Sequence, residues 1–420
     1  MNYRLPRGTY DILDEEIGKW HWLEEIIHDL CRRSHYTEVR TPIFEQTELF
    51  VRGVGETTDI VGKEMYTFHD RRNRSLTLRP EGTAGIVRAF VEHKKYAGNM
   101  PQKYYYLGPM FRYEKPQAGR FRQFHQFGVE VFGSDDPALD AEVIALGLNF
   151  FSSLGLQNVR VEINSVGDPA CRSEYRQKLV EYFTAYRDRL SKEDLIRLER
   201  NPMRILDSKD PNIQTLIADA PVMLDYLNDP CRTHFERLKE YLDALQVPYV
   251  VNPRLVRGLD YYTLTAFEFM TDVDGVHAGT IGGGGRYNRL VSELGGPELP
   301  GIGFGIGLER VLLACEQQQV AIPEKAGLDC YLVVVDEEAK AEAIRLLMAL
   351  RQAGLKSDMD YSNRKMKGQM KAAVRANARY ALIMGEDERK AASVSVKCLE
   401  TGEQELVPLK QVVDRLKRSE

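Results

Sequence analysis

Residues 111–130 read FRYEKPQAGRFRQFHQFGVE, and this stretch decides the fold of the chain. Aromatic residues at both ends favour two half-buried β-strands, and the loop between them contains the turn residues Pro116 and Gly119. The sequence therefore predicts a β-hairpin that holds the carboxylate of Glu130 and a set of guanidinium groups on a rigid sheet. These guanidinium groups belong to Arg112, Arg120 and Arg122. The hairpin suits phosphate binding at one end and recognition of a small polar ligand at the other. Taken one at a time, the arginines are explained equally well as solvated side chains on an aromatic hairpin.

The bulk composition is that of a globular protein with more than one domain. A chain of 420 residues is long enough to bury large cores, and this length predicts two or more domains. Its 43% hydrophobic and 28% charged residues are ordinary values for globular proteins. A net charge of −5 argues against a protein that simply coats nucleic acid, but a local basic face is enough to bind RNA.

Cysteine usage and the N-terminus indicate the compartment. The six cysteines form no CxxC pair and no metal-ligand cluster along the sequence, which predicts reduced structural thiols; they are Cys31, Cys171, Cys231, Cys315, Cys330 and Cys398. The first residues, MNYRLPRG, contain no apolar run of the secretory kind, and no apolar stretch is long enough to span a membrane. We therefore expect a cytoplasmic protein without a membrane partner.

The pattern along the chain predicts a β-rich part that is interrupted by helices. Helical spacing of apolar residues predicts a helix over 14–35, and the segment 38–50 around Thr41-Pro42 reads as extended. Further strands are expected at 76–78, 104–107 and 159–164, with a helix over 137–154. Residues 170–247 are charged and poor in glycine, so we expect a helical insertion within the β-rich domain.

Two glycine-rich stretches follow, Gly282–Gly285 and Gly301–Gly307. Neither matches the phosphate loop GxxxxGK[ST], and 301–307 carries glycine at every second position rather than as GxGxxG. This alternation puts the glycines on one face of a strand, where a flat ligand can lie against the backbone. Tight strand packing explains the glycines equally well if the stretch is taken alone. From Leu308 the chain turns helical and carries Arg310 in the first turn.

The C-terminal part predicts a small mixed α/β domain. After a linker at 323–327, strand and helix patterns alternate, and a hairpin turning at Thr401-Gly402 precedes a last helix. The segment 361–385 has six basic residues and no acidic one. Four of them recur at every fourth position and predict one basic helix face; they are Lys367, Lys371, Arg375 and Arg379. A solvated surface explains such a face as readily as RNA contact does.

These strings resemble the class II aminoacyl-tRNA synthetases over essentially the whole chain. Residues 111–130 resemble motif 2, 301–310 motif 3, and the Thr41-Pro42 region motif 1, which packs across a dimer axis in the class. The string LRPEGT at 78–83 resembles a segment that binds the amino acid. The string RGLDYY at 257–262 is similar to a signature peculiar to the histidyl-tRNA synthetase family.

The resemblance implies an α+β fold with an antiparallel-sheet catalytic domain over 1–325, its helical insertion over 170–247, and a mixed α/β anticodon-binding domain over 326–420. It also implies a homodimer. The implied activity is histidine–tRNA ligation. L-histidine and ATP would form histidyl-adenylate and pyrophosphate, and the histidine would then pass to the 3′ end of tRNA(His). Mg²⁺ would accompany ATP, with no metal site fixed by the protein itself.

The resemblance also assigns roles to single residues. Glu130 would accept from an imidazole N–H, and Tyr262 would partner the other ring nitrogen; the remaining histidine-binding residues would be Glu81, Thr83, Gln126 and Tyr261. Arg112 and Arg257 would act on the α-phosphate during attack by the histidine carboxylate, and Arg120 and Arg310 would bind ATP. The residues expected to contact tRNA are Gln117, Lys367, Lys371 and Arg375. His125 receives no role, and Thr263-Leu264-Thr265 looks somewhat unusual for the family.

Two other interpretations compete with an enzyme. One is a synthetase-like regulatory subunit of ATP phosphoribosyltransferase, which lacks the anticodon-binding domain and degrades the motif residues. The other is a sensor domain that binds uncharged tRNA and belongs to a much larger chain. The chain retains Arg112, Gln126, Glu130, Arg257 and Arg310 together with a complete C-terminal domain, and this favours the enzyme.

Overall fold

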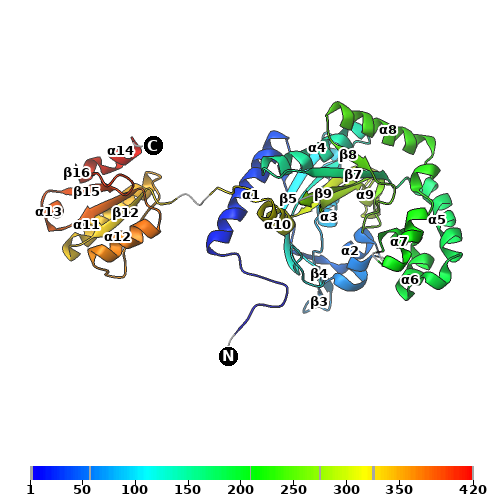
Figure 1. Cartoon of the computed structure of the whole chain (residues 1–420), viewed down its shortest axis with the longest axis horizontal. Coiled ribbons are helices and arrows are strands. Elements are labelled where there is room, and N and C mark those ends of the chain that lie inside the picture. The colour runs from blue at the N-terminus through cyan, green and yellow to red at the C-terminus, as the bar shows by residue number, and fades with distance from the viewer. Residues whose placement is uncertain (1–2, 56–57, 209, 274–275, 324–326, 419–420) are drawn as a thin grey trace. The chain divides into compact units, whose positions relative to one another are not determined.

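The computed structural model describes residues 3–55, 58–208, 210–273, 276–323 and 327–418. The chain divides into two compact units, Met1–Ile322 and Pro323–Glu420. The domain boundary expected between residues 325 and 326 lies outside the described residues. Each unit is described by itself below (Figure 1).

The first unit is built on a large, mainly antiparallel sheet. Among the described residues it has eight strands in the order β1-β5-β6-β11-β10-β9-β7-β8, and only the outer pairs β1–β5 and β7–β8 are parallel. In that order the strands are Thr37–Glu38, Gln102–Phe111, Gln123–Phe132, Gly301–Gly307, Val276–Arg286, Thr263–Val273, Val159–Ser165 and Tyr249–Val251. A smaller sheet of order β2-β4-β3 consists of Phe44–Gln46, Ser75–Leu78 and Thr67–His69.

Among the described residues, four helices cover one face of the large sheet, and two others, Thr83–Glu92 and Leu290–Glu293, pack against part of its remaining surface beside the site. The core between them contains Phe127, Phe269 and Phe304 from the strands and Leu23 and Phe150 from the helices. The covering helices are α1 (Asp14–Arg33), α4 (Pro137–Ser153), α8 (Asp229–Ala244) and α10 (Leu308–Gln317). The smaller sheet lies near α2 (Thr47–Val54) and α3 (Thr83–Glu92), and α9 spans Leu290–Glu293. Within the described residues no helix has the length and apolar character needed to cross a membrane.

The hairpin predicted over 111–130 forms, but its strands lie further apart in the sequence than expected. Strand β5 ends at Phe111 and β6 begins at Gln123, so the three arginines at 112, 120 and 122 lie in the connection rather than on the sheet. The reason is packing, because the ring of Phe121 packs at a tilt against Tyr10 and that of Tyr113 packs edge-on against Tyr66, instead of facing each other across the hairpin. One hydrogen bond of 2.9 Å from Arg112 N to Arg122 O still ties the connection to the strand ends.

The segment between β7 and β8 is helical, with a hydrophobic cluster of its own. Figure 1 shows α5, α6 and α7 gathered at one side of the unit. Its helices are α5 (Pro169–Thr184), α6 (Lys192–Arg200), α7 (Pro211–Asp219) and α8. Each begins at a side chain that accepts a hydrogen bond from the first turn; these N-cap residues are Asp168, Ser191, Asp210 and Asn228. We refer to α5–α8 and their connections as the insertion.

The fold corrects the expectation that the cysteines form no cluster. Cys171 and Cys231 come from the first turns of α5 and α8, and their sulfur atoms lie 3.7 Å apart. Asp168 joins them, with ligand atoms of all three within 4.8 Å of one another. The sequence hid this group because 60 residues separate the two cysteines.

The second unit is a five-stranded mixed sheet of order β13-β12-β14-β15-β16 among the described residues. In that order the strands are Ser357–Met359, Cys330–Val334, Tyr380–Met384, Ser393–Cys398 and Gln404–Pro408. The helices are α11 (Lys340–Gln352), α12 (Met366–Arg375), α13 (Glu386–Lys390) and α14 (Val412–Lys417). Arg379 was expected on the same helix as Lys371, but α12 ends at Arg375 and the left-handed backbone of Asn377 (φ 49°) turns the chain toward β14. Together the two units confirm the predicted α+β class.

Candidate active site

A polar cleft of about 510 Å³ opens on the glycine-bearing face of the large sheet. Within the described part of the chain, five arginine side chains from four segments line it, and we call this site the arginine cleft; they are Arg112, Arg120, Arg204, Arg257 and Arg310. Carboxylates of Asp59, Glu64, Glu114, Glu268 and Glu309 also line it, beside Gln126 and glycines of β10 and β11. Guanidinium groups in this number suit a ligand that carries phosphate groups, and the carboxylates balance their charge in the empty cleft.

Contacts with neighbouring groups fix Arg112, Arg120 and Arg310 in the cleft. Arg112 donates from Nε to the carbonyl of Pro80 at 2.8 Å and lies over the ring of Phe124 at 5.3 Å. Arg120 is 3.6 Å from the carboxylate of Glu114. Arg310, in the first turn of α10, donates to the carbonyl of Thr280. Burial lowers the pKa of Arg310, and the neighbouring guanidinium groups lower it further.

Arg257 is largely enclosed by its neighbours. It forms an ion pair with Glu268, which also accepts from Thr280 at 2.8 Å, and its guanidinium lies 5.7 Å from the ring of Tyr262. Burial disfavours its charge, but Glu268 and Tyr262 more than compensate, so the pKa of Arg257 is raised. Its Nε is buried and has no hydrogen-bond partner among the described residues. Gly283 makes room for it, because a Cβ there would lie 2.7 Å from Nη1.

A second group of polar side chains lies beside the arginine cleft and is closed to solvent. We call it the carboxyl pocket and define it by Glu81, Thr83, Glu130 and Tyr287, all buried. Glu81 accepts from the backbone N–H of Thr83 and of Ala84, both at 2.8 Å, at the start of α3. Glu130, on β6, accepts from the Thr83 hydroxyl at 2.6 Å and from the Tyr287 hydroxyl.

Burial sets the protonation of this pocket. It raises the pKa of Glu130 to about 8, against the lowering effect of the Thr83 and Tyr287 hydroxyls. Burial also raises the pKa of Glu81, and the two carboxyl groups oppose each other's ionisation. At neutral pH Glu130 therefore sits close to its own pKa. A ligand that donates N–H groups to it will favour the carboxylate form.

Gln126 connects the pocket to the cleft. It lines the arginine cleft, and its Oε1 atom is buried without a partner among the residues described here. The bare face of β11 lies alongside, since a Cβ on Gly303 would overlap the Glu130 carboxylate and one on Gly305 would lie 3.6 Å from Gln126 Nε2. Tyr261 and Tyr262 are buried with ring centroids 4.6 Å apart, and Tyr261 lies 5.7 Å from Tyr287. The unpartnered Oε1 of Gln126 is therefore an acceptor that a ligand in the cleft can use.

Several site residues escaped the sequence reasoning. Tyr287 directly follows the glycine run 282–285, and that position was the available signal. Glu268 and Arg204 line the cleft, but no motif marks them. His125, which had no role, is held by Glu309 through its backbone N–H and its Nδ1 at 2.9 and 3.0 Å. Its ring lies 4.7 Å from that of Trp20, so its contacts are structural.

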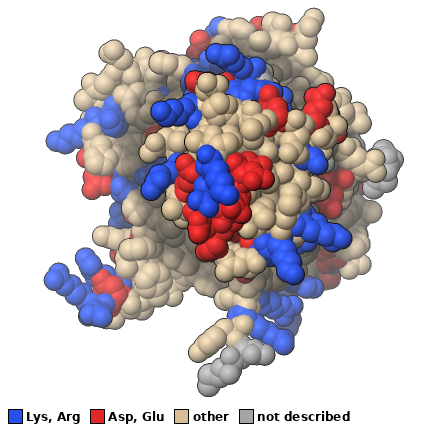
Figure 2. All heavy atoms as spheres, turned by 90° about the vertical axis from the view of Figure 1, so that its left-hand side faces the viewer, with Lys and Arg blue, Asp and Glu red and all other residues tan. Residues whose placement is uncertain are grey.

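The residues expected to contact tRNA lie at the surface. Gln117 is exposed in the hairpin connection, bridged to Arg120. Lys367, Lys371 and Arg375 are exposed along α12. The face drawn in Figure 2 has basic side chains around a central group of acidic ones, so positive charge there is local rather than uniform.

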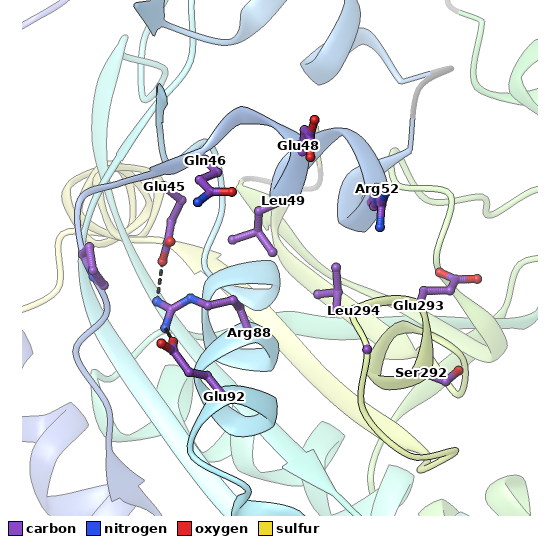
Figure 3. A pocket seen from close by; sticks show the side chains of 12 residues that line it. Glu45, Gln46, Glu48, Leu49, Arg52, Arg88, Glu92, Ser292, Glu293 and Leu294 are labelled. Atoms are coloured by element: carbon purple, nitrogen blue, oxygen red, sulfur yellow. Dashed lines mark hydrogen bonds and ion pairs between the residues drawn. The ribbon is translucent and has the colours of Figure 1, made fainter. Parts of the chain in front are cut away.

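A separate hollow of about 680 Å³ lies beside Pro42. Figure 3 shows α2, α3 and α9 around it, with Arg88 paired to Glu45 and to Glu92 at 2.5 and 2.7 Å. Large apolar side chains are exposed on the adjoining segments, including Ile43, Phe44 and Phe68. An exposed apolar group of this kind marks a surface for protein contact.

Comparison with known proteins extends these observations. A family model of histidyl-tRNA synthetases matches residues 8–311, and an anticodon-binding domain model matches residues 329–419. A histidine–tRNA ligase of Geobacillus sp. (strain WCH70) is 55% identical over 99% of both chains, and one of Bacillus subtilis (strain 168) is 50% identical over the full length of both. The crystal structure of an apo Staphylococcus aureus histidyl-tRNA synthetase, 43% identical, superposes with a TM-score of 0.85 over 99% of this chain and all of that one.

Proposed function

Because the chain belongs to the histidyl-tRNA synthetase family and is an ATP-dependent ligase of histidine to tRNA, we propose that the arginine cleft and the carboxyl pocket together form its adenylation site. The carboxyl pocket takes the histidine side chain, and the arginine cleft takes ATP. One observation carries this assignment: a group of buried carboxyl side chains adjoins a cleft lined by five guanidinium groups. The regulatory and sensor interpretations are set aside, because the relatives at 50–55% identity are ligases over their full length.

Histidine is recognised by paired hydrogen bonds. A neutral imidazole offers one donor and one acceptor. The Glu130 carboxylate accepts from one ring nitrogen, and the Tyr262 hydroxyl partners the other. The unpartnered Oε1 of Gln126, together with Glu81 and Thr83, faces the substrate ammonium, and Tyr261 closes the pocket. Such buried groups reject amino acids that lack these hydrogen bonds by roughly 10⁴–10⁵.

The chemical step is an in-line attack at the α-phosphorus. A carboxylate oxygen of histidine forms the new bond to phosphorus, the bond to the bridging oxygen breaks, and pyrophosphate leaves. Negative charge grows on the α-phosphate oxygens during attack, and Arg112 and Arg257 stabilise it. The orphaned Nε of Arg257 supports this role, because it is an unused donor in the cleft. Arg120 and Arg310 hold the distal phosphates.

Mg²⁺ fits the donor set of the cleft. It prefers oxygen ligands and is usually carried by substrate phosphates with one or two carboxylates. Glu64 lines the cleft and offers such oxygens, whereas Glu114, Glu268 and Glu309 already contact Arg120, Arg257 and His125. The ion would neutralise part of the triphosphate charge.

Adenylation is tested by pyrophosphate exchange. The parent enzyme should exchange pyrophosphate into ATP only when L-histidine is present. Phenylalanine and glutamine serve as controls, since one lacks ring nitrogens and the other lacks the ring. Exchange with either at a rate comparable to that with histidine would contradict the proposed pocket.

A homodimer is the proposed assembly, with the Thr41-Pro42 region at the twofold interface. The exposed side chains of Ile43, Phe44 and Phe68 support it, as does the isologous packing common to homodimers. Light scattering should return twice the 48.0 kDa chain mass at micromolar concentration. Ile43→Asp with Phe44→Asp should lower that mass to one chain, and a parent of monomer mass would refute the dimer.

For tRNA we propose contact through Gln117 and through the α12 residues Lys367, Lys371 and Arg375. The anticodon-binding family match to the second unit and the exposure of these side chains support this. A cytoplasmic location is also proposed. It is supported by the need for tRNA and by the free thiols, since no cysteine among the described residues is in a disulfide.

A further inference from the structure

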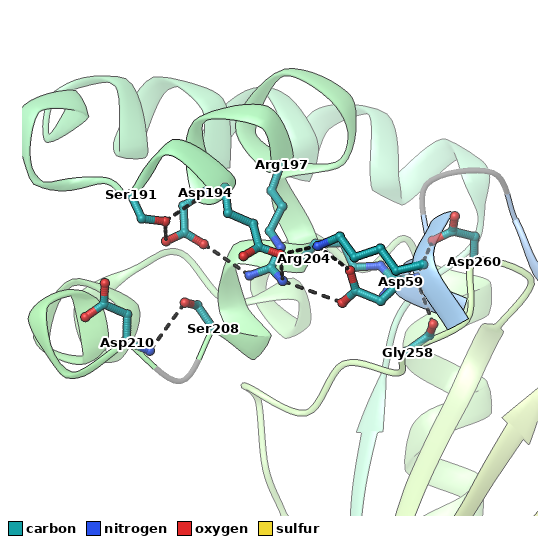
Figure 4. A network of polar contacts seen from close by, with 11 residues as sticks. Asp59, Ser191, Asp194, Arg197, Arg204, Ser208, Asp210, Gly258 and Asp260 are labelled. Carbon is teal, nitrogen blue, oxygen red and sulfur yellow. Dashed lines mark hydrogen bonds and ion pairs between the residues drawn. The ribbon is translucent and has the colours of Figure 1, made fainter. Parts of the chain in front are cut away.

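The RGLDYY segment, residues 257–262, is held in place by the insertion. Arg204 donates from Nη2 to the carbonyl of Gly258 at 2.8 Å and to the Asp260 carboxylate at 3.1 Å. Asn201 donates to the same carboxylate oxygen at 3.2 Å. Figure 4 shows Arg204 reaching from the insertion toward Gly258 and Asp260. Side chains of the insertion thus donate hydrogen bonds to a segment that contains two proposed adenylation residues, Arg257 and Tyr262.

Further contacts fix the same segment at its far end and from its other side. Arg172, on α5, donates to the carbonyl of Tyr262 and, at 2.9 Å, to that of Val166. On the catalytic side, the backbone N–H of Asp260 donates to Val54 at 3.2 Å. Gly55 follows with φ +107°, and a Cβ there would collide with the Asp260 side chain. The segment is therefore enclosed between α2 and the insertion.

Arg204 differs from the other ion pairs that join the insertion to the cleft. Arg197 lies 3.7 Å from Asp59, and Lys63 lies 3.1 Å from Glu193, but both contacts involve well-exposed groups. Exposed pairs of this kind contribute little to rigidity. The Arg204 side chain is only 12% exposed, and it binds a main-chain carbonyl as well as a carboxylate. A largely buried guanidinium nitrogen that bridges a main-chain carbonyl and a carboxylate constrains position better than an exposed pair of flexible side chains does.

We propose that Arg204 is a positioning residue for adenylation. By fixing the Gly258 carbonyl and Asp260, it sets where Arg257 and Tyr262 point, so the insertion is a working part of the adenylation site. Arg204 also lines the arginine cleft, but its Nη2 donors are directed at the RGLDYY segment. This inference rests on the proposed function of Arg257.

The test compares Arg204→Ala with a matched variant of the same insertion. Arg189→Ala is the control, because Arg189 also donates to a backbone carbonyl, that of Asn212, but its hydrogen bonds to Asn212 and Thr215 lie within the insertion. Misplacement of a catalytic group by about 1 Å costs on the order of 100-fold in rate. Arg204→Ala should therefore lower kcat for histidine-dependent pyrophosphate exchange by about 10–100-fold, with KM for ATP changed much less. Arg204→Lys, which keeps one donor for Gly258, should recover part of the loss.

A double-mutant cycle separates positioning from direct phosphate binding. If Arg204 acts through Asp260, then Arg204→Ala adds little to the loss caused by Asp260→Ala. Additive losses together with a raised KM for ATP would mean that Arg204 binds ATP itself, and they would overturn the proposal. A folded Arg204→Ala enzyme as active as Arg189→Ala would overturn it too. If Arg204→Ala does not fold, Arg204→Lys and Arg204→Gln decide the same comparison.

Hydrogen exchange gives a readout that does not depend on the reaction. Amides of residues 258–262 should exchange faster in Arg204→Ala than in the parent and in Arg189→Ala, while the strands β5 and β6 stay protected. Unchanged exchange in that segment would overturn the role of Arg204 even if activity fell. A parent without histidine-dependent pyrophosphate exchange would instead refute the proposed function, and the hydrogen-exchange result would still decide whether Arg204 holds the segment.

Discussion

The carboxyl pocket and the arginine cleft share one sheet face but are built on opposite principles. Glu130 is 1% exposed, with both carboxylate oxygens accepting from hydroxyl groups. The cleft instead opens on the surface, and two of its arginines keep donors for a ligand: Arg112 is anchored through its Nε, and the Nε of Arg257 has no partner among the described residues. Selecting one amino acid requires complete, desolvated hydrogen bonding, because unpaired buried groups are costly. Stabilising charge that appears only during reaction requires donors that the resting protein leaves unused.

Arg257→Ala should have the largest effect, and it tests the cleft side of this contrast. Loss of a donor that stabilises charge at the α-phosphorus should lower the rate of histidyl-adenylate formation by about 10²–10³. Histidine affinity should change much less, since its contacts lie in the carboxyl pocket. Single-turnover adenylation and equilibrium histidine binding measure the two quantities. A rate within a few-fold of the parent would make Arg257 structural and remove the contrast.

Glu130→Gln tests the pocket side. The substitution keeps the shape but removes the charge, and a hydrogen bond to a charged group is worth about 1.5–3 kcal/mol. KM for histidine should therefore rise by about 10–100-fold, while kcat at saturating histidine changes little. Thr67→Val, on β3 of the smaller sheet, is a control of similar size away from both sites. A kcat loss without a KM change would mean that recognition and chemistry are not divided as proposed.

The pH dependence of histidine binding should sharpen the contrast further. Burial raises the pKa of Glu130 to about 8, so below that pH the empty pocket holds a proton that an N–H donor must displace. Histidine affinity should accordingly rise with pH between about 7 and 8, by at most tenfold per pH unit, and level off above. Titration of the ligand imidazole is the same for parent and Glu130→Gln, so the difference between their binding profiles isolates Glu130. Parallel profiles would place the pKa of Glu130 outside this range.

Neutralising α12 should have the smallest effect and leave both sites untouched. Lys371→Ala with Arg375→Ala should raise KM for tRNA several-fold and reduce the salt slope of tRNA binding by about 1–2. Histidine-dependent pyrophosphate exchange should not change. Lys410→Ala with Lys417→Ala removes the same charge from exposed positions elsewhere in the unit and is the control. Equal effects of the two pairs would mean that only net charge matters.

The predictions from sequence were most accurate where the spacing of neighbouring residues determines the local structure. The glycine alternation of β11 and the helix carrying Arg310 were predicted from period and composition alone. The hairpin was foreseen, but its arginines were placed on strands, because aromatic packing against the distant Tyr10 and Tyr66 leaves no local pattern. Arg379 was misplaced for the opposite reason, since regular spacing continued beyond the end of α12.

Residues that reach the site through tertiary contact were beyond prediction. Glu130 was identified, but its partner Tyr287 is 157 residues away. Arg204 contacts residues 54 and 56 positions ahead of it, from a segment whose composition predicted only a helical insertion. Contacts of this kind join residues that are distant in the sequence. They are set by the tertiary fold, and no local sequence pattern indicates them.

The hydrogen bonds from Arg204 to Gly258 and Asp260 have a thermodynamic consequence of their own. Coupling between two binding sites is reciprocal: the factor by which one ligand changes the affinity for the other equals the factor by which the other changes the affinity for the first. If a macromolecule that binds the insertion changes the conformation of the RGLDYY segment, it changes the affinity for histidine by some factor. Histidine then changes the affinity for that macromolecule by the same factor. Titrating tRNA with and without saturating histidine would measure this factor directly. A factor of one would mean that the two substrates bind independently.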